Sequence, residues 1–332
     1  MFPQPGMALS NFQSGDLRVF RCSIARSKWA VRTLKRLVQL SIKLQNHYFL
    51  DGYILEVFTM ASPFSEWMRR HPVISFYVLA FVITWLGWIP QAAYSHGLFP
   101  IQSPLFSLLG SAGPTFAALI VTLLLAGKAG VRDLFAPLLR WRVSVIWYAV
   151  ALFWQPVILL AAIGLNMFLG KPTPDFGKVS PWFIVFPILL TNLLINSWEE
   201  VGWRGFALPR LQARHSALLS SLIIGVLGGL WHLPLFLDKS NPMSTFPFIA
   251  WFIGTVASAV LYTWLYNNTK GSLLVVSVFH AAGNTATVAV FIAVGGAISV
   301  QDFLLVTGMT CLAAMIIVAI FGPARLLRQS VT

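Results

Sequence analysis

The stretch VIWYAVALFWQPVILLAAIGLNMFL, residues 145–169, contains no acidic, basic or histidine side chain. As a helix it would be about 37 Å long, which is enough to cross the hydrocarbon core of a bilayer. Seven other apolar runs recur along the chain, separated by short polar or basic turns, at 72–94, 104–126, 181–199, 216–237, 246–266, 272–294 and 303–322. The sequence therefore predicts an all-α fold, a polytopic membrane helix bundle with about eight transmembrane helices.

The composition supports a lipid environment. Of the 332 residues, 57% are hydrophobic and 10% are charged, and the mean hydropathy is +0.76. Soluble globular domains usually carry about 25% charged residues. A net charge of +13 would fit a nucleic-acid-binding protein if the basic residues formed one patch. They are instead spread between the apolar runs, so we expect membrane lipid rather than nucleic acid as a partner.

The basic residues also predict the orientation of the helices. If the N-terminus is cytoplasmic, only Lys171, Lys178 and Lys239 fall in the segments outside the cell. Because cytoplasmic loops are enriched in Lys and Arg, we expect both termini in the cytoplasm of a multi-pass integral membrane protein, at the plasma membrane if it is bacterial. The twelve basic residues on the inside are Arg69, Arg70, Lys128, Arg132, Arg140, Arg142, Arg204, Arg210, Arg214, Lys270, Arg325 and Arg328.

Residues 1–59 differ from the membrane domain, which we assign to residues 60–332. They carry eight Lys or Arg residues against three acids and contain no apolar run that could span a bilayer. Two interpretations remain open. The segment is a basic extension, either disordered or forming an amphipathic helix on anionic lipid, or the reading frame is over-extended and the protein starts at Met60.

The first unusual polar cluster lies at the end of the apolar run 181–199. Glu199 and Glu200 are adjacent, so on a helix their side chains point about 100° apart and are unsuited to one shared role. Arg204 follows Glu200 by four residues, a spacing that places both on one helical face and predicts an ion pair. Glu199 would then remain free for chemistry. The alternative is a helix end at the membrane surface with solvated charges.

Two further polar clusters lie on later apolar runs. His232 lies within 216–237, and Pro234 should disturb the helix directly after it. His280 and Asn284 are four residues apart within 272–294, which places them on one helical face. A hydrogen-bonded core histidine and small residues that permit close helix packing are the structural alternatives. Together, however, a glutamate, two histidines and an asparagine converging inside a bundle would suffice for water activation and oxyanion stabilisation.

These three motifs, in this order, resemble the CPBP family of intramembrane proteases, which comprises the type II CAAX prenyl endopeptidases and the bacteriocin-immunity proteins called Abi. The family pattern is Glu-Glu-xxx-Arg, then Phe-xxx-His, then His-xxx-Asn/Asp. The resemblance covers about residues 180–290. Gly228 is a departure, because the family usually has Phe four residues before the histidine that corresponds to His232. We expect this difference to alter the shape of the site without removing a catalytic group.

The resemblance implies catalytic roles for all six polar residues. Glu199 would be the general base that activates water, and His232 would help to hold that water. His280 and Asn284 would stabilise the oxyanion. Glu200 and Arg204 would order the site.

The resemblance also bears on cofactors and substrate. We expect no required cofactor or metal. Zinc would be possible only if Glu199, His232 and His280 converged from three helices, since the chain has no HExxH motif. The implied activity is a membrane endopeptidase, CAAX protease-like, acting on a hydrophobic or lipidated peptide or protein. Two alternatives remain: a transporter whose buried acids and histidines relay protons or ions, and a non-catalytic membrane scaffold or immunity protein.

Hydropathy raises one geometric difficulty. It places Glu199 near the inner end of its helix and His232 near the outer end of the next, about 20 Å apart in depth. A joint site therefore requires that the helix carrying Glu199 run further inward, or that residues 204–218 be partly embedded in the membrane. Gly202, Gly205 and Pro209 favour an irregular, re-entrant segment at this point.

Overall fold

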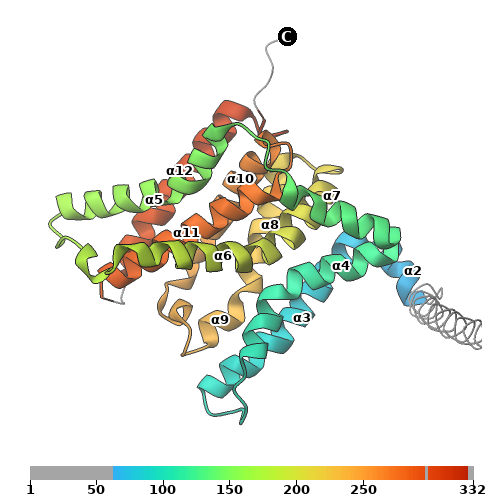
Figure 1. Ribbon diagram of the computed structural model, residues 1–332, viewed down its shortest axis with the longest axis horizontal. Coiled ribbons are helices and arrows are strands. Elements are labelled where there is room, and N and C mark those ends of the chain that lie inside the picture. Colours follow the sequence, from blue (N-terminus) through green and yellow to red (C-terminus); the bar gives the residue numbers. More distant parts are fainter. Residues whose placement is uncertain (1–62, 296–297, 328–332) are drawn as a thin grey trace, which may run out of the picture. The chain divides into compact units, whose positions relative to one another are not determined.

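A computed structural model describes residues 63–295 and 298–327 (Figure 1). The chain divides into two compact units, Met1–Ser65 and Glu66–Thr332, and the second is described below. In the described ranges the chain forms helices and no strands, which confirms the all-α fold. The expected extension 1–59 and the start at Met60 lie outside the described residues.

Eight helices among the described residues are long and apolar enough to cross a membrane. They confirm the number of spans expected from the sequence, and six of the eight end within three residues of the predicted bounds. The second and fourth are much longer than predicted. The eight spans are Pro72–Ser95, Pro104–Leu139, Val145–Phe168, Trp182–Gln212, Ala217–Leu237, Phe248–Asn268, Leu273–Ala293 and Val300–Phe321.

The spans are built from the following elements. The short helix α2 (Pro63–Arg70) precedes α3 (Pro72–Ser95), α4 (Pro104–Phe135) and α5 (Val145–Phe168). The middle of the chain forms α6 (Val185–Glu200), η4 (Val201–Ala207), α7 (Leu208–Gln212), α8 (Ala217–Trp231) and α9 (Leu233–Leu237). The last three helices are α10 (Phe248–Asn268), α11 (Leu273–Ala293) and α12 (Val300–Phe321). Short 3₁₀ turns occur at Ala136–Leu139, Phe176–Lys178, Trp182–Ile184 and Pro242–Thr245.

Glycines allow two of the helix pairs to pack closely. In Figure 1, α3 runs along α4, and α8 lies against α10. A Cβ atom at Gly110 of α4 would lie 2.0 Å from the Nε1 atom of Trp88 on α3. On α8, a Cβ atom at Gly225 would lie 2.8 Å from the Cα atom of Val256 on α10. Because lipid tails are as apolar as the helices, close van der Waals packing of this kind is a main stabilising term in a membrane bundle.

The fourth span corrects the expected end of a helix near Glu199. The chain continues as the π-helical segment η4 and then as α7, so it stays helical to Gln212 and no re-entrant loop forms at 202–209. Hydropathy ended the helix too early because it counts Glu200 and Arg204 as polar, whereas both are buried in the bundle. Glu199 therefore lies 17 residues after Trp182 and 13 before Gln212, near the middle of the span.

Close packing favours the wider turn of η4. A Cβ atom at Gly202 would lie 2.5 Å from the Cβ atom of Pro114 on α4, so only glycine permits this approach. The hydroxyl of Thr115 donates a hydrogen bond to the carbonyl of Trp198, just before the π-helical segment. Such segments occur mostly as single turns inside α-helices, and frequently at functional sites. Here it contains Arg204 and directly follows Glu199 and Glu200, and all three are buried in the bundle.

Candidate active site

Glu200 and Arg204 form the buried ion pair that their spacing predicts. The Nη1 atom of Arg204 lies 3.0 Å from the Oε1 atom of Glu200, and the two side chains are 8% and 0% exposed. The Nδ1 atom of His280, on α11, donates to the same Oε1 atom at 2.8 Å. A carboxylate only accepts hydrogen bonds, so this contact assigns the proton to Nδ1 and leaves Nε2 as the second functional atom of the ring. The buried carboxylate thus joins η4 to α11.

Glu199 points elsewhere, as expected for adjacent residues on a helix. It is buried, at 8% exposed, and it lines a cavity of about 900 Å³ inside the membrane spans. His232, His280 and Asn284 line the same cavity. Glu200 is fully buried behind the cavity wall. The structure therefore separates one carboxylate that faces the cavity from one that is used in pairing.

His232 is held in one orientation by its surroundings. Its Nδ1 atom donates to the carbonyl oxygen of Gly228 at 2.7 Å, and its ring lies 4.6 Å from Trp231 and 5.1 Å from Trp251 between centroids. Because Nδ1 carries the proton, Nε2 of the neutral ring offers a lone pair. The α-helix α8 ends at Trp231 and α9 begins at Leu233 with Pro234 in its first turn, which confirms the expected break.

Asn284 is placed by a second asparagine. Its Nδ2 atom donates to the Oδ1 atom of Asn196 at 3.4 Å, a long hydrogen bond between α11 and α6. One turn further along α6, Asn192 donates to the hydroxyl of Thr285 at 3.0 Å. These contacts tie α6 to α11 beside the cavity. His280 and Asn284 share one helical face, as their spacing predicts.

Three neighbours of the site were missed in the sequence. The ring of Tyr262, on α10, lies 4.0 Å from the guanidinium carbon of Arg204 and 5.6 Å from the His280 ring. Trp251 of the same helix packs on His232. Neither aromatic residue stands out in a chain that is 14% aromatic. Asn196 did carry a signal, because it is a polar residue in an apolar run three residues before Glu199.

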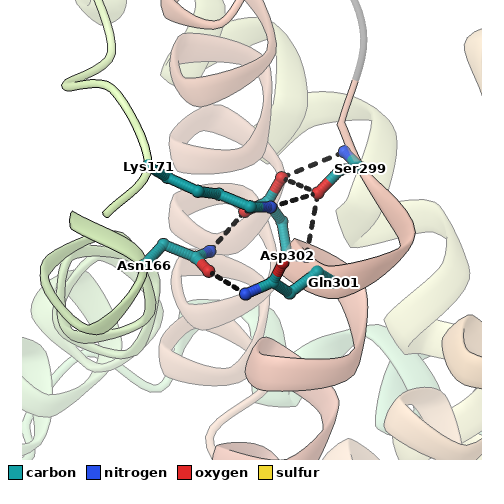
Figure 2. A network of polar contacts seen from close by, with 5 residues as sticks. All are labelled: Asn166, Lys171, Ser299, Gln301 and Asp302. Atoms are coloured by element: carbon teal, nitrogen blue, oxygen red, sulfur yellow. Dashed lines mark hydrogen bonds and ion pairs between the residues drawn. The ribbon is translucent and has the colours of Figure 1, made fainter. Parts of the chain in front are cut away.

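A second polar network joins five residues, four of which (Asn166, Lys171, Ser299 and Asp302) also line the cavity (Figure 2). Asn166, near the end of α5, donates to Asp302 on α12 and accepts from the Nε2 atom of Gln301 at 3.0 Å. The Nζ atom of Lys171 lies 2.7 Å from the hydroxyl of Ser299 and 3.4 Å from Asp302. Ser299 and Asp302 also form the capping box of α12. The network thus joins the end of α5 to the start of α12.

The donor set does not form a metal site. Within residues 63–295 and 298–327, no three His, Cys, Asp or Glu side chains lie close enough together to hold one ion. Glu199, His232 and His280, the expected ligands if zinc were used, are therefore not gathered as ligands. The three residues nevertheless line one cavity, to which the histidines contribute free ring nitrogens and Glu199 contributes a carboxylate. This arrangement suits proton transfer and hydrogen bonding.

Comparisons with known proteins cover the segment that carries these residues. The family model described as Type II CAAX prenyl endopeptidase Rce1-like matches residues 181–286, a segment that contains all six polar residues. A protein named CAAX prenyl protease 2, from Methanococcus maripaludis, is 26% identical over 218 residues, which cover 62% of this chain and 80% of that protein. These two matches support the resemblance to the CPBP family that the three motifs indicate. The matched segment begins with the fourth span and ends on α11, close to the limits of 180 and 290 given by the resemblance.

The Phe-to-Gly departure from the CPBP pattern is visible in the geometry. Gly228 lines the cavity, and its carbonyl oxygen positions His232. A backbone carbonyl performs this role whatever the side chain is. The departure therefore changes the space beside the histidine and leaves the hydrogen bond that orients it.

Proposed function

We propose that this chain is an intramembrane endopeptidase that hydrolyses peptide bonds in a hydrophobic or lipidated, CAAX-like substrate. The single observation that carries the proposal is the cavity shared by Glu199, His232, His280 and Asn284 within the membrane spans. The name of the relative, CAAX prenyl protease 2, supports a prenylated substrate of this type. In keeping with the distribution of basic residues, we place both termini in the cytoplasm.

In the proposed reaction, Glu199 is the general base. A water molecule donates one hydrogen bond to Glu199 and the other to Nε2 of His232, whose tautomer offers a lone pair there. As the water oxygen attacks the peptide carbonyl carbon, its proton passes to Glu199. The same proton passes to the amine when the C–N bond breaks, which yields a carboxylic acid and an amine and regenerates Glu199. The new carboxylic acid then loses its proton to bulk water. General base catalysis of this kind contributes about 10²- to 10⁴-fold to the rate.

His280 and Asn284 are proposed to stabilise the oxyanion. The amide of Asn284 has a second N–H besides the one donated to Asn196, and His280 donates from Nε2 when its ring is doubly protonated. Preorganised donors of this type stabilise developing negative charge most strongly where water is excluded. Glu200 and Arg204 are positioning residues, because they hold the His280 ring and do not face the cavity as a pair. No metal takes part in this scheme.

The test is a cleavage assay in detergent with a library of hydrophobic and prenylated peptides. We expect Glu199→Ala to lose about 10²- to 10⁴-fold in kcat/KM and to unfold at the same denaturant concentration as the wild type. The matched control is Glu66→Ala, which removes an exposed acid on α2 and should leave cleavage unchanged.

Two results would contradict the proposed function. Full cleavage by Glu199→Ala would remove the general base from the scheme. Cleavage by the wild type that a chelator abolishes and zinc restores would overturn the metal-free mechanism while retaining the protease. A wild type that cleaves no peptide in the library, and whose function survives Glu199→Ala, would instead be a non-catalytic scaffold.

A further inference from the structure

Gly228 occupies a position on α8 where a side chain would point into open space. A Cβ atom built on it meets no heavy atom within 4 Å, and the residue lines the cavity. Its backbone is helical and does not have the positive φ that would call for glycine. Neither the backbone nor the packing therefore requires glycine at this position.

The two neighbouring glycines of α8 are different. A Cβ atom at Gly225 would lie 2.8 Å from the backbone of Val256, and one at Gly229 would lie 2.6 Å from the ring of Phe252. Both are needed for the close approach of α8 to α10. Gly228 instead costs the helix about 0.5–1 kcal/mol relative to alanine without any packing contact in return. Its effect on the molecule is to leave space in the cavity.

That space lies beside the proposed reacting groups. Gly228 is one helical turn before His232, and its carbonyl oxygen holds the Nδ1 atom of that histidine at 2.7 Å. Ile224, one turn before Gly228, lines the same side of the cavity, so the three residues form a continuous strip. Since one turn of helix rises about 5.4 Å, a group that lies over Gly228 is about one side-chain length from the His232 ring.

Apolar side chains are prominent in the lining of the cavity into which this space opens. Ile224 lies on one side, and Trp203 and Trp251 also line the cavity. His232, one turn later on the same strip, has its Nδ1 atom already used by the Gly228 carbonyl. An apolar group placed there would gain from burial against these side chains.

We propose that the space over Gly228 is a subsite for a bulky apolar side chain of the substrate residue next to the scissile bond. Gly228 is then a specificity-determining residue, because any larger residue at this position would fill the subsite. The inference rests on the proposed function, since it takes the scissile carbonyl to lie at His232. The occupant is an amino-acid side chain rather than a lipid chain, because the space adjoins the group that holds the water.

The test uses peptides that differ only at the two residues flanking the cleaved bond, which are glycine or alanine in one set and leucine, phenylalanine or tryptophan in the other. The enzymes are the wild type, Gly228→Ala and Gly228→Phe. The matched control is Gly308→Phe on α12, where a Cβ atom also meets nothing within 4 Å but the residue is exposed outside the cavity. A single methylene changes discrimination in an apolar pocket by about 10- to 200-fold.

We expect the wild type and Gly308→Phe to prefer the bulky peptides. In Gly228→Phe the ratio of kcat/KM between bulky and small peptides should fall by about 100-fold, with Gly228→Ala in between. The same shift should appear in the affinity of fluorescent peptides for the uncleaving Glu199→Ala background with and without Gly228→Phe. This binding measurement tests the subsite even if cleavage of the library is absent.

The outcomes separate the subsite from the proposed function. An equal loss on all peptides in Gly228→Phe, or an unchanged ratio, would overturn the subsite while wild-type cleavage retains the protease. Gly228→Phe could instead change kcat/KM only for peptides that carry a farnesyl group, whatever their flanking side chains. That result would assign the space to lipid and would also overturn the subsite. If the wild type cleaves no peptide and also binds small and bulky peptides equally well, both the subsite and the proposed function are overturned.

Discussion

Replacing Arg204 by methionine tests how the bundle holds a buried carboxylate. Arg204 is the strong partner of Glu200 at 3.0 Å, and its guanidinium carbon lies 4.0 Å from the Tyr262 ring. Methionine keeps much of the apolar volume and removes the charge. Glu200, at 0% exposed, would then remain in the protein interior with His280 as its neighbour.

The expected loss of stability follows from burial. Removing one partner of a buried ion pair costs about 3–5 kcal/mol, because the remaining charge stays desolvated without compensation. The chain supplies a matched control in Arg70→Met. Glu66 and Arg70 form an ion pair with the same spacing of four residues, but these side chains are 59% and 70% exposed. An exposed pair of this kind contributes about 0.3–0.5 kcal/mol.

The assay is equilibrium unfolding in mixed micelles, with the free energy of unfolding compared between each variant and the wild type. We expect Arg204→Met to lose about 3 kcal/mol more than Arg70→Met. Adding Glu200→Gln to Arg204→Met should recover part of the loss, because the neutral amide carries a smaller desolvation cost. If Arg204→Met is no less stable than Arg70→Met, burial does not strengthen the pair and the reasoning is refuted.

Two further changes test the packing that surrounds the site by the same unfolding measurement. Gly202→Ala would place a Cβ atom 2.5 Å from the Cβ atom of Pro114 and should lower the free energy of unfolding by about 1–3 kcal/mol. The control is Gly164→Ala, whose Cβ atom meets nothing within 4 Å and should not destabilise the protein. Equal losses in the two variants would contradict this explanation of η4. Asp302→Ala removes the acceptor shared by the α5–α12 network and should cost about 1–3 kcal/mol. Asp133→Ala, at a side chain that is 72% exposed, is its control, and an equally small loss in both would show that the network is not stabilising.

Local patterns in the sequence predicted much of this protein. Apolar runs of about 20 residues predicted eight spans because each charged residue placed in hydrocarbon adds its own free-energy cost, and these costs can be summed along the sequence. The spacing of Glu200 and Arg204, and of His280 and Asn284, predicted shared helical faces because an α-helix returns to the same side every four residues. The order of the three motifs indicated the CPBP family, which the comparisons bear out.

The remaining features depend on contacts between distant segments, which local patterns do not encode. Hydropathy ended the fourth helix at Glu199, and only the partners of Glu200 and Arg204 in the bundle show why the helix continues to Gln212. The sequence made Glu199 and Glu200 equally polar neighbours. Tertiary structure turned one toward the cavity and the other toward His280, 80 residues later. It also decided that Gly228 leaves open space where Gly225 permits packing, because that difference lies in what α10 places opposite each residue.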